Sequence, residues 1–221
     1  MTVDVIMLSL TKFSDESIVT ETAIRSLRAC ETESLKFNIV LYEGNPKVLF
    51  DEADRTEHYD FDFNYNRLMN QGIQSTSNDF VIMTNNDVLF INGFWDEMLK
   101  GFENFDSLSP NDPSNLYESD AEFVRGYGIG KELRGYCIAV KRKALQKIGN
   151  LDEGVRFWYS DNIYADQLKK AKLSHAISLR SYVYHLNGGS QTVKGLEKRE
   201  RVELRSGQKP VYDEAKKKYK L

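Results

Sequence analysis

Apolar runs alternate with helical patterns along the first part of the chain. The runs over Val3–Leu10, Phe37–Tyr42 and Phe80–Met83 predict buried strands, because they are short and almost continuously apolar. Between them, apolar residues recur at helical spacing over Glu16–Cys30 and over Asn66–Ser75. An order of strand, helix, strand, helix, strand is typical of a mostly parallel sheet flanked by helices, so we expect an α/β fold.

The second half of the chain begins with another helical pattern and a long polar stretch. An amphipathic helix is expected to begin at Gly93-Phe94-Trp95 and to end near Phe105. Residues Ser107–Gly130 are rich in Ser, Asn, Asp, Pro and Gly, which predicts a long loop. The patterns after it predict a strand, two helices and a late strand, at Tyr136–Val140, Lys143–Ile148, Asn162–Lys172 and Ala176–Tyr184.

Polar residues stand where the predicted strands end. Thr11 follows the first strand, Glu43 follows the second, and Asn85-Asn86-Asp87 interrupts the apolar run that contains the third. In parallel sheets ligands bind beyond the carboxyl ends of the strands, so we expect these residues to lie along one such edge. Two amides and a carboxylate at a strand end form a turn in many proteins, and they also suit a divalent metal that holds a diphosphate.

Composition is that of a globular domain without a membrane span. The chain has 221 residues, of which 41% are hydrophobic and 29% charged. Cys30 and Cys137 lie in apolar patterns without metal or disulfide spacing, which favours reduced thiols and a reducing compartment. No run approaches the ~20 apolar residues that cross a bilayer, and no basic segment precedes the first apolar run. We therefore expect a cytoplasmic protein without a transmembrane segment.

Charge is distributed unevenly along the chain. The formal net charge is −3, but Val193–Leu221 contains ten Lys or Arg against five acidic residues. Such a segment is either a solvated helix with a charged tail or a surface for nucleic acid or an anionic membrane. We expect one domain over residues 1–192 and a basic helical extension over residues 193–221.

Four motifs follow one another in a defined order. Phe63–Ile73 reads Phe-Asn-Tyr-Asn-Arg-Leu-Met-Asn-Gln-Gly-Ile, and Asn85-Asn86-Asp87 follows it. Gly135–Leu145 begins with Gly, five further residues and Lys-Arg, and Ile148–Glu153 ends in Leu-Asp-Glu. Together they resemble the nucleotide-sugar glycosyltransferases of the GT-A fold, in particular the family 2 type, over about Val3–Ser190. The resemblance implies a GT-A, Rossmann-like mixed sheet.

The resemblance also implies a metal and donor site. Asp87 corresponds to the last carboxylate of the family's Asp-x-Asp motif, which binds Mn²⁺ or Mg²⁺ that bridges the donor diphosphate. His185 corresponds to a late histidine that reaches the metal or the diphosphate, although a lone His after a strand is often structural. Glu43 stands where relatives accept a hydrogen bond from the nucleotide base, uracil being the expected one. The expected donor-binding residues are Ser9, Thr11, Glu43, Asn64, Asn66, Arg67, Asn85, Asn86 and Gly135.

Asp161 is the expected catalytic residue. It stands where the resemblance places the carboxylate before a helix, and an inverting transferase requires a base that takes a proton from the acceptor hydroxyl. Asp before a helix is also a common N-cap, and the two roles are compatible. Ser160 replaces the acidic residue that is common at the preceding position, which puts any role of that residue in acceptor binding in doubt.

Three functional hypotheses remain open at this stage. The leading one is an inverting, metal-dependent glycosyltransferase that moves a sugar from a UDP-sugar to an acceptor hydroxyl. The acceptor is either a glycan or a hydroxymethylated DNA base, the latter because the C-terminal segment is basic. The alternative from another class is a non-catalytic sugar-nucleotide binding module. A nucleotidyltransferase is disfavoured, because no Gly-rich phosphate loop follows the first strand.

Overall fold

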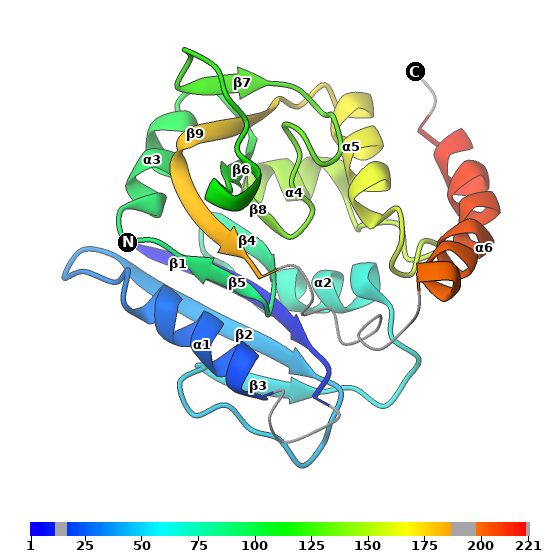
Figure 1. Cartoon of the computed structure of the whole chain (residues 1–221), viewed down its shortest axis with the longest axis horizontal. Helices are drawn as coiled ribbons and strands as arrows, with labels where there is room; N and C mark the ends of the chain where they lie inside the picture. Colours follow the sequence, from blue (N-terminus) through cyan, green and yellow to red (C-terminus); the bar gives the residue numbers. More distant parts are fainter. Residues whose placement is uncertain (12–16, 187–197, 220–221) are drawn as a thin grey trace.

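Parallel strands form the N-terminal half of one mixed sheet (Figure 1). The structure is a computed structural model that describes residues 1–11, 17–186 and 198–219, with the side chains of residues 198–204 left out. Along this half the strands lie in the order β3-β2-β1-β4, and neighbours are parallel. The strands are β1 (Thr2–Ser9), β2 (Lys36–Glu43), β3 (Arg55–His58) and β4 (Phe80–Asn85).

The other half of the sheet is mainly antiparallel. Beyond β4 the order continues as β8-β6-β9-β5, and β7 also pairs with β9. Only β6 and β9 run parallel in this half of the described chain. These strands are β5 (Val88–Phe90), β6 (Ser107–Asn111), β7 (Phe123–Arg125), β8 (Cys137–Lys141) and β9 (His175–His185). The expected α/β class with a mostly parallel, GT-A-like mixed sheet is confirmed.

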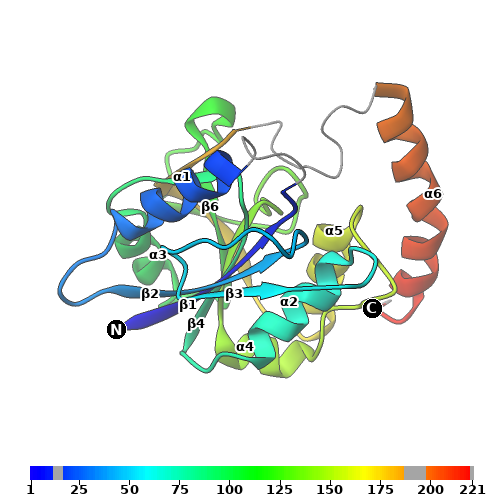
Figure 2. The ribbon, with the colours of Figure 1, turned by 90° about the horizontal axis from the view of Figure 1, so that it is seen from below.

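Helices cover both faces of this sheet because side chains of the strands alternate between them. Val3, Val5 and Met7 of β1 pack on one face with α1 and α3, whereas Ile6 and Leu8 pack on the other with α2, α4 and α5. Figure 2 shows α1 above the strands and α2 and α4 below them. The helices are α1 (Ser17–Arg28), α2 (Tyr65–Gln74), α3 (Phe94–Gly101), α4 (Arg142–Ile148), α5 (Ser160–Lys170) and α6 (Lys198–Lys217).

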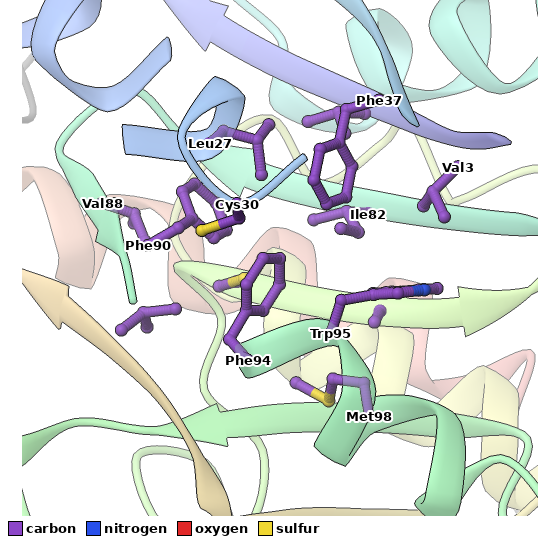
Figure 3. Packing of buried hydrophobic residues seen from close by; sticks show 14 of the residues in the cluster. Val3, Leu27, Cys30, Phe37, Ile82, Val88, Phe90, Phe94, Trp95 and Met98 are labelled. Carbon is purple, nitrogen blue, oxygen red and sulfur yellow. The ribbon is translucent and has the colours of Figure 1, made fainter. Parts of the chain in front are cut away.

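Aromatic side chains fill the core under α1 and α3 (Figure 3). Phe94 and Trp95 of α3 lie against Phe37 of β2, with ring centroids 5.9 Å and 6.4 Å from that of Phe37. Phe80 of β4 packs edge-on against Trp95 at 5.7 Å. Such pairs add about 0.5–1.5 kcal/mol each beyond the apolar area that they bury. The helix α3 is therefore fastened to the sheet by its first turn, although it ends at Gly101 rather than near Phe105 as expected.

A buried carboxylate near the start of β1 links this strand to β2, to the segment before β4 and to α4. Asp4 of β1 is fully buried and accepts hydrogen bonds from Asn38 Nδ2, from Asn78 N and Nδ2, and from Arg142 Nη2, each at 2.7–2.8 Å. Arg142, at the start of α4, also donates to the carbonyls of Asn78 and Ile73. These hydrogen bonds satisfy both the carboxylate of Asp4 and the guanidinium of Arg142, which offsets the cost of burying the two charges. Arg142, the second residue of the Lys-Arg pair in the third motif, is thus part of the fold.

The expected loop over Ser107–Gly130 is only partly a loop. It contains β6, which is buried along its whole length, and the short strand β7. Polar side chains of β6 are satisfied inside the molecule: Ser107 Oγ accepts from Tyr164 Oη at 2.9 Å and lies 2.9 Å from His175 Nδ1. Burial lowers the pKa of His175 to about 4, so its ring is neutral at physiological pH. The polar sequence did not predict this central strand, because the Ser107 hydroxyl finds its partners in α5 and β9.

The helix α6 packs on α5 and on the segment before it (Figure 1). Tyr212 and Ala215 of α6 form a small apolar cluster with Val155 and Ile163, and Tyr212 Oη donates to Asp166 Oδ2 at 3.0 Å. The expected helical extension is therefore seated on the domain over the described part of its length. The expected boundary at residue 192 lies within residues 187–197, which are outside the described residues. No described helix is both long and apolar enough to cross a membrane.

Replacing the buried cation of the Asp4 network will destabilise the fold. Arg142→Met leaves Asp4 buried beside two amides but without a cation, which typically costs about 3–5 kcal/mol of unfolding free energy. Urea denaturation followed by circular dichroism measures the loss. As a control, Arg25→Met removes an ion pair with Glu52 at 2.8 Å whose arginine is 64% exposed, and we expect a much smaller change. Equal losses in the two variants would contradict the structural role of Asp4 and Arg142.

Candidate active site

The ends of three parallel strands lie next to one another at one edge of the sheet. Ser9 is paired in register with Glu43, and Leu8 with Asn85, so the expected alignment is present. Glu43 is fully buried, and its carboxylate accepts hydrogen bonds from Thr11 N and Asn45 N at 2.8 Å and from Thr11 Oγ1 at 2.9 Å. Within the described residues, Glu43 therefore fixes the segment that follows β1. Its expected contact with a nucleotide base stays a prediction.

Asn86 points away from the sheet edge toward α1. Its Nδ2 donates to Thr20 Oγ1 at 2.8 Å and to Ser9 Oγ at 3.3 Å, and the two hydroxyls lie 3.0 Å apart. All three side chains are buried. These hydrogen bonds hold the turn of residues 86 and 87 against α1. Ser9 and Asn86 therefore support the position of the site from the side of α1.

Asp87 and His185 are brought together by the pairing of two short strand segments. Val88 of β5 is paired with His185 of β9, and Leu186 N donates to Asp87 O at 3.0 Å. Consequently Asp87 Oδ1 lies 3.4 Å from His185 Nε2, although the residues are far apart in sequence. The ring of Tyr136 stacks on that of His185, with centroids 4.3 Å apart and planes 13° from parallel. The histidine is thereby held facing the carboxylate.

This pair fits a divalent cation that also binds a phosphate-bearing ligand. One carboxylate oxygen and one imidazole nitrogen at 3.4 Å are close enough to bind the same ion. No group of three potential metal ligands occurs among the described residues. Mg²⁺ is commonly held by one or two carboxylates together with substrate phosphates and water, so two protein ligands suffice.

The segment that begins α2 serves chiefly to hold another loop. Asn64 caps α2 by accepting from Arg67 N, and its Nδ2 donates to Glu153 O. Asn66 Nδ2 donates to Asp152 O at 2.8 Å and to Val155 O at 3.2 Å. These amides fasten the Leu-Asp-Glu motif to α2, so the first and fourth motifs lie next to each other.

Asp161 stands in the first turn of α5 and not before it. The helix begins at Ser160, and its N-cap is Tyr159 in the left-handed region with φ 71°, so the N-cap interpretation of Asp161 is wrong. Burial raises the pKa of the Asp161 carboxyl, while the hydrogen bond from Asn162 N and the charge of Arg205 partly oppose that rise. A Cβ on Gly135 would lie 2.9 Å from Asp161 Oδ2. The glycine leaves room for the carboxylate.

A cavity of about 400 Å³ extends between Asp161 and His185. Of the expected site residues, five line it: Asn66, Asn85, Gly135, Asp161 and His185. The other expected residues do not line it, and Asp87 borders it through its contact with His185. Arg67 is directed elsewhere, with its guanidinium carbon 3.9 Å above the ring of Phe61.

Sequence reasoning missed several residues that line the cavity. They are mainly aromatic or flank the residues it identified: Tyr65, Arg134, Tyr136, Trp158 and Tyr159. Arg134 and Tyr136 stand on either side of Gly135, so their position in the third motif was a signal for them. Trp158 and Tyr159 precede Asp161, but an aromatic pair before a helix is more often packed in a core.

Comparisons with solved structures show what this fold is similar to. GalNAc-T7, crystallised with UDP, GalNAc and Mn²⁺, is similar over 83% of this chain with a TM-score of 0.65 at 10% identity. S. aureus TarS 1-349 in complex with UDP-GlcNAc is similar over 83% with a TM-score of 0.59 at 11% identity. Both are glycosyltransferases of the GT-A fold, which confirms the expected fold of this chain. No family model and no curated protein matches the sequence.

The likeness covers only part of these proteins. The chain spans 43% of the GalNAc-T7 chain and 58% of the TarS chain in the UDP-GlcNAc complex. Another structure of TarS 1-349 is similar over 91% of this chain and 69% of that one, with a TM-score of 0.60 at 11% identity. At such identities the likeness concerns the fold.

Removing the charge of Asp161 will stabilise the protein in a pH-dependent way. Because burial raises the folded-state pKa above the unfolded value, the folded state retains the proton longer than the unfolded state does. The wild type therefore loses stability as pH rises from the unfolded pKa, about 3.9 for Asp, through the higher folded pKa. We expect the stability of Asp161→Asn relative to wild type to increase over that window and to be constant above it.

Urea denaturation at a series of pH values measures this difference. The matched control is Asp96→Asn, which removes an exposed carboxylate from the first turn of α3. A difference for Asp161→Asn that is flat or that falls with rising pH would show that this carboxyl is not held in a desolvated site.

Proposed function

We propose that this protein is an inverting, metal-dependent glycosyltransferase that moves a sugar from a UDP-sugar to an acceptor hydroxyl. The observation that carries the proposal is the cavity at the carboxyl edge of the sheet. It brings Asp161, whose pKa is raised, into the same space as His185 and its partner Asp87. A carboxylate poised as a base and a cation-binding pair are the two components that such a transfer requires.

Asp161 acts on the acceptor. Its carboxylate takes the proton from the acceptor hydroxyl while that oxygen forms a bond to the anomeric carbon of the sugar. The bond from the anomeric carbon to the phosphate oxygen breaks on the opposite face, and its electron pair leaves with the nucleoside diphosphate. A raised pKa makes the carboxylate a stronger base, which favours this role as long as the group is ionised.

Asp87 and His185 act on the leaving group. With Mn²⁺ or Mg²⁺ bound, the ion would supply the positive charge that stabilises the departing diphosphate. The protein contributes Asp87 Oδ1 and His185 Nε2, and Tyr136 orients the imidazole by stacking on it. Asn85 lines the cavity at the end of β4, which supports a role of its amide in binding the ribose or the diphosphate. UDP and Mn²⁺ in the GalNAc-T7 structure, and UDP-GlcNAc in that of TarS, support this assignment.

The two carboxylates have separable roles, which variants will distinguish. We expect Asp87→Asn to weaken binding of UDP in the presence of Mn²⁺ by at least about tenfold, because the ion loses the carboxylate ligand that the described residues provide. We expect Asp161→Asn to bind UDP with Mn²⁺ as the wild type does and to lose at least about 10²-fold in transfer or donor hydrolysis. Calorimetric titration with UDP and release of UDP from a panel of UDP-sugars are the measurements.

The outcomes also separate an enzyme from a binding module. Asp96→Asn, an exposed carboxylate that does not line the cavity, serves as the control for both assays. UDP binding without turnover in the wild type, with Mn²⁺ present, would favour the non-catalytic sugar-nucleotide binding module. Turnover retained in Asp161→Asn would contradict its role as the base.

The acceptor hydroxyl belongs to a glycan or to a hydroxymethylated DNA base, and α6 bears on this choice. Its Gln208 Oε1 accepts from Trp158 N at 3.0 Å, and the guanidinium of Arg205 lies 5.6 Å from the ring centroid of Tyr159. Trp158 and Tyr159 line the cavity, so a basic helix stands at its rim. That position suits an acceptor with a phosphate backbone.

A DNA acceptor predicts salt-sensitive binding that depends on α6. Duplex DNA with hydroxymethylcytosine is expected to bind the wild type at low salt, and Lys216→Gln in α6 is expected to weaken that binding and its salt dependence. Lys100→Gln, an exposed lysine of α3, is the matched control. Fluorescence anisotropy measures both. If DNA does not bind at low salt, the acceptor is assigned to the glycan class.

A further inference from the structure

Three buried polar groups around the cavity have no hydrogen-bond partner within the described residues. They are Arg134 Nε, Tyr136 Oη and Ser160 Oγ, and all three residues line the same cavity of about 400 Å³. A buried donor without an acceptor typically costs about 1–3 kcal/mol, and water, an ion or a ligand commonly satisfies it. Their convergence on one cavity indicates a polar subsite there.

Arg134 is held in place by hydrogen bonds with neutral groups. Its backbone N–H donates to Ser109 Oγ at 3.0 Å, and its Nη2 donates to Asn115 O at 2.9 Å. The residue is only 3% exposed. A buried guanidinium is normally paired, because removing a cation from water without an anion is costly.

No carboxylate of the described chain forms an ion pair with Arg134. Asp112 is buried and acts electrostatically on Tyr136, as Arg134 does, but its Oδ1 accepts from Ser114 N at 2.9 Å and from Ser114 Oγ at 2.7 Å. Asp161 interacts electrostatically with Arg205 of α6. The cavity therefore presents a fixed cation whose charge these carboxylates do not directly pair.

We propose that Arg134, together with Tyr136 and Ser160, binds a carboxylate on the transferred sugar, so that the donor is a nucleotide sugar of the uronic acid class. This inference rests on the proposed function, since the sugar must occupy this cavity. A carboxylate accepts a charge-assisted hydrogen bond from Nε and neutralises the guanidinium in a desolvated site. The hydroxyls of Tyr136 and Ser160 bind polar groups of the sugar.

The arrangement also separates this subsite from the one for the diphosphate. The ring face of Tyr136 covers His185, which belongs to the cation-binding pair, whereas the charge of Arg134 acts on the hydroxyl of the same side chain. One tyrosine thus adjoins both the end of the cavity that suits the diphosphate and the group that suits the acidic sugar. Gly135, between Arg134 and Tyr136, keeps the wall open toward Asp161.

Binding of three related ligands tests the inference. Calorimetric titration with Mn²⁺ present compares UDP, UDP-glucose and UDP-glucuronic acid. We expect the wild type to bind UDP-glucuronic acid at least about tenfold more tightly than UDP-glucose, as a charge-assisted hydrogen bond implies. In Arg134→Gln this preference is expected to disappear while the affinity for UDP stays unchanged. Arg125→Gln, an exposed arginine that does not line the cavity, is expected to retain the preference.

Two further variants keep the test independent of folding defects at Arg134. Tyr136→Phe and Ser160→Ala each remove one hydroxyl. Each variant is expected to bind both UDP-sugars more weakly relative to UDP, and to keep the preference for UDP-glucuronic acid over UDP-glucose. The comparison of ligands on the wild type needs no variant at all. Equal affinities for UDP-glucose and UDP-glucuronic acid, or an Arg134→Gln variant that loses affinity for UDP itself, would overturn the inference. No binding of UDP would instead overturn the proposed function and the inference with it.

Discussion

The pairing of β5 with β9 is the constraint on which the candidate site depends. The chain leaves the parallel sheet at the end of β4, turns at residues 86 and 87, and joins the far edge of the sheet by only three residue pairs. Because Val88 lies opposite His185, Asp87 meets the imidazole at 3.4 Å. The turn is held from behind by the hydrogen bonds of Asn86 with Thr20 and Ser9. A site built from two segments that are distant in sequence thus rests on one short antiparallel contact.

Buried amides and carboxylates give this molecule much of its order. Asp4 with Arg142, and Asn66 with the carbonyls of residues 152 and 155, join segments that are distant in sequence. In each network the buried polar groups have hydrogen-bond partners among the described residues. Their burial therefore costs little, and the partners fix their geometry. The cavity differs from these networks, because Arg134, Tyr136 and Ser160 present polar atoms without partners. The satisfied networks hold the fold, and the three unpaired groups beside the cavity are the basis of the proposed sugar subsite.

The region before α5 connects the chemistry to the C-terminal helix. Tyr159 adopts a left-handed backbone conformation at the start of α5, and its ring stacks on that of Tyr212 at 5.0 Å with planes 6° apart. The next two residues, Ser160 and Asp161, line the cavity. Arg205 of α6 also opposes the rise in the pKa of Asp161. The helix α6 therefore influences both the position and the charge of the expected base. The basic extension is therefore part of the environment of the site.

The sequence by itself determined the α/β class, the strands β1, β2, β4, β8 and β9, and the polar residues at the strand ends. It did so because buried strands and amphipathic helices have short-range periods, and because parallel strands end at a common edge. The motifs also pointed to Asp87, Asp161 and His185, whose roles stay predictions. Only the tertiary structure showed that β6 is a buried central strand, since its hydroxyls are satisfied by Tyr164 and His175 from other elements. It alone separated Asn86, Asn64 and Glu43, whose polar atoms bind the chain itself, from Arg134 and Tyr136, which line the cavity. Hydrogen-bond partners are set by long-range contacts, and a local pattern does not encode them.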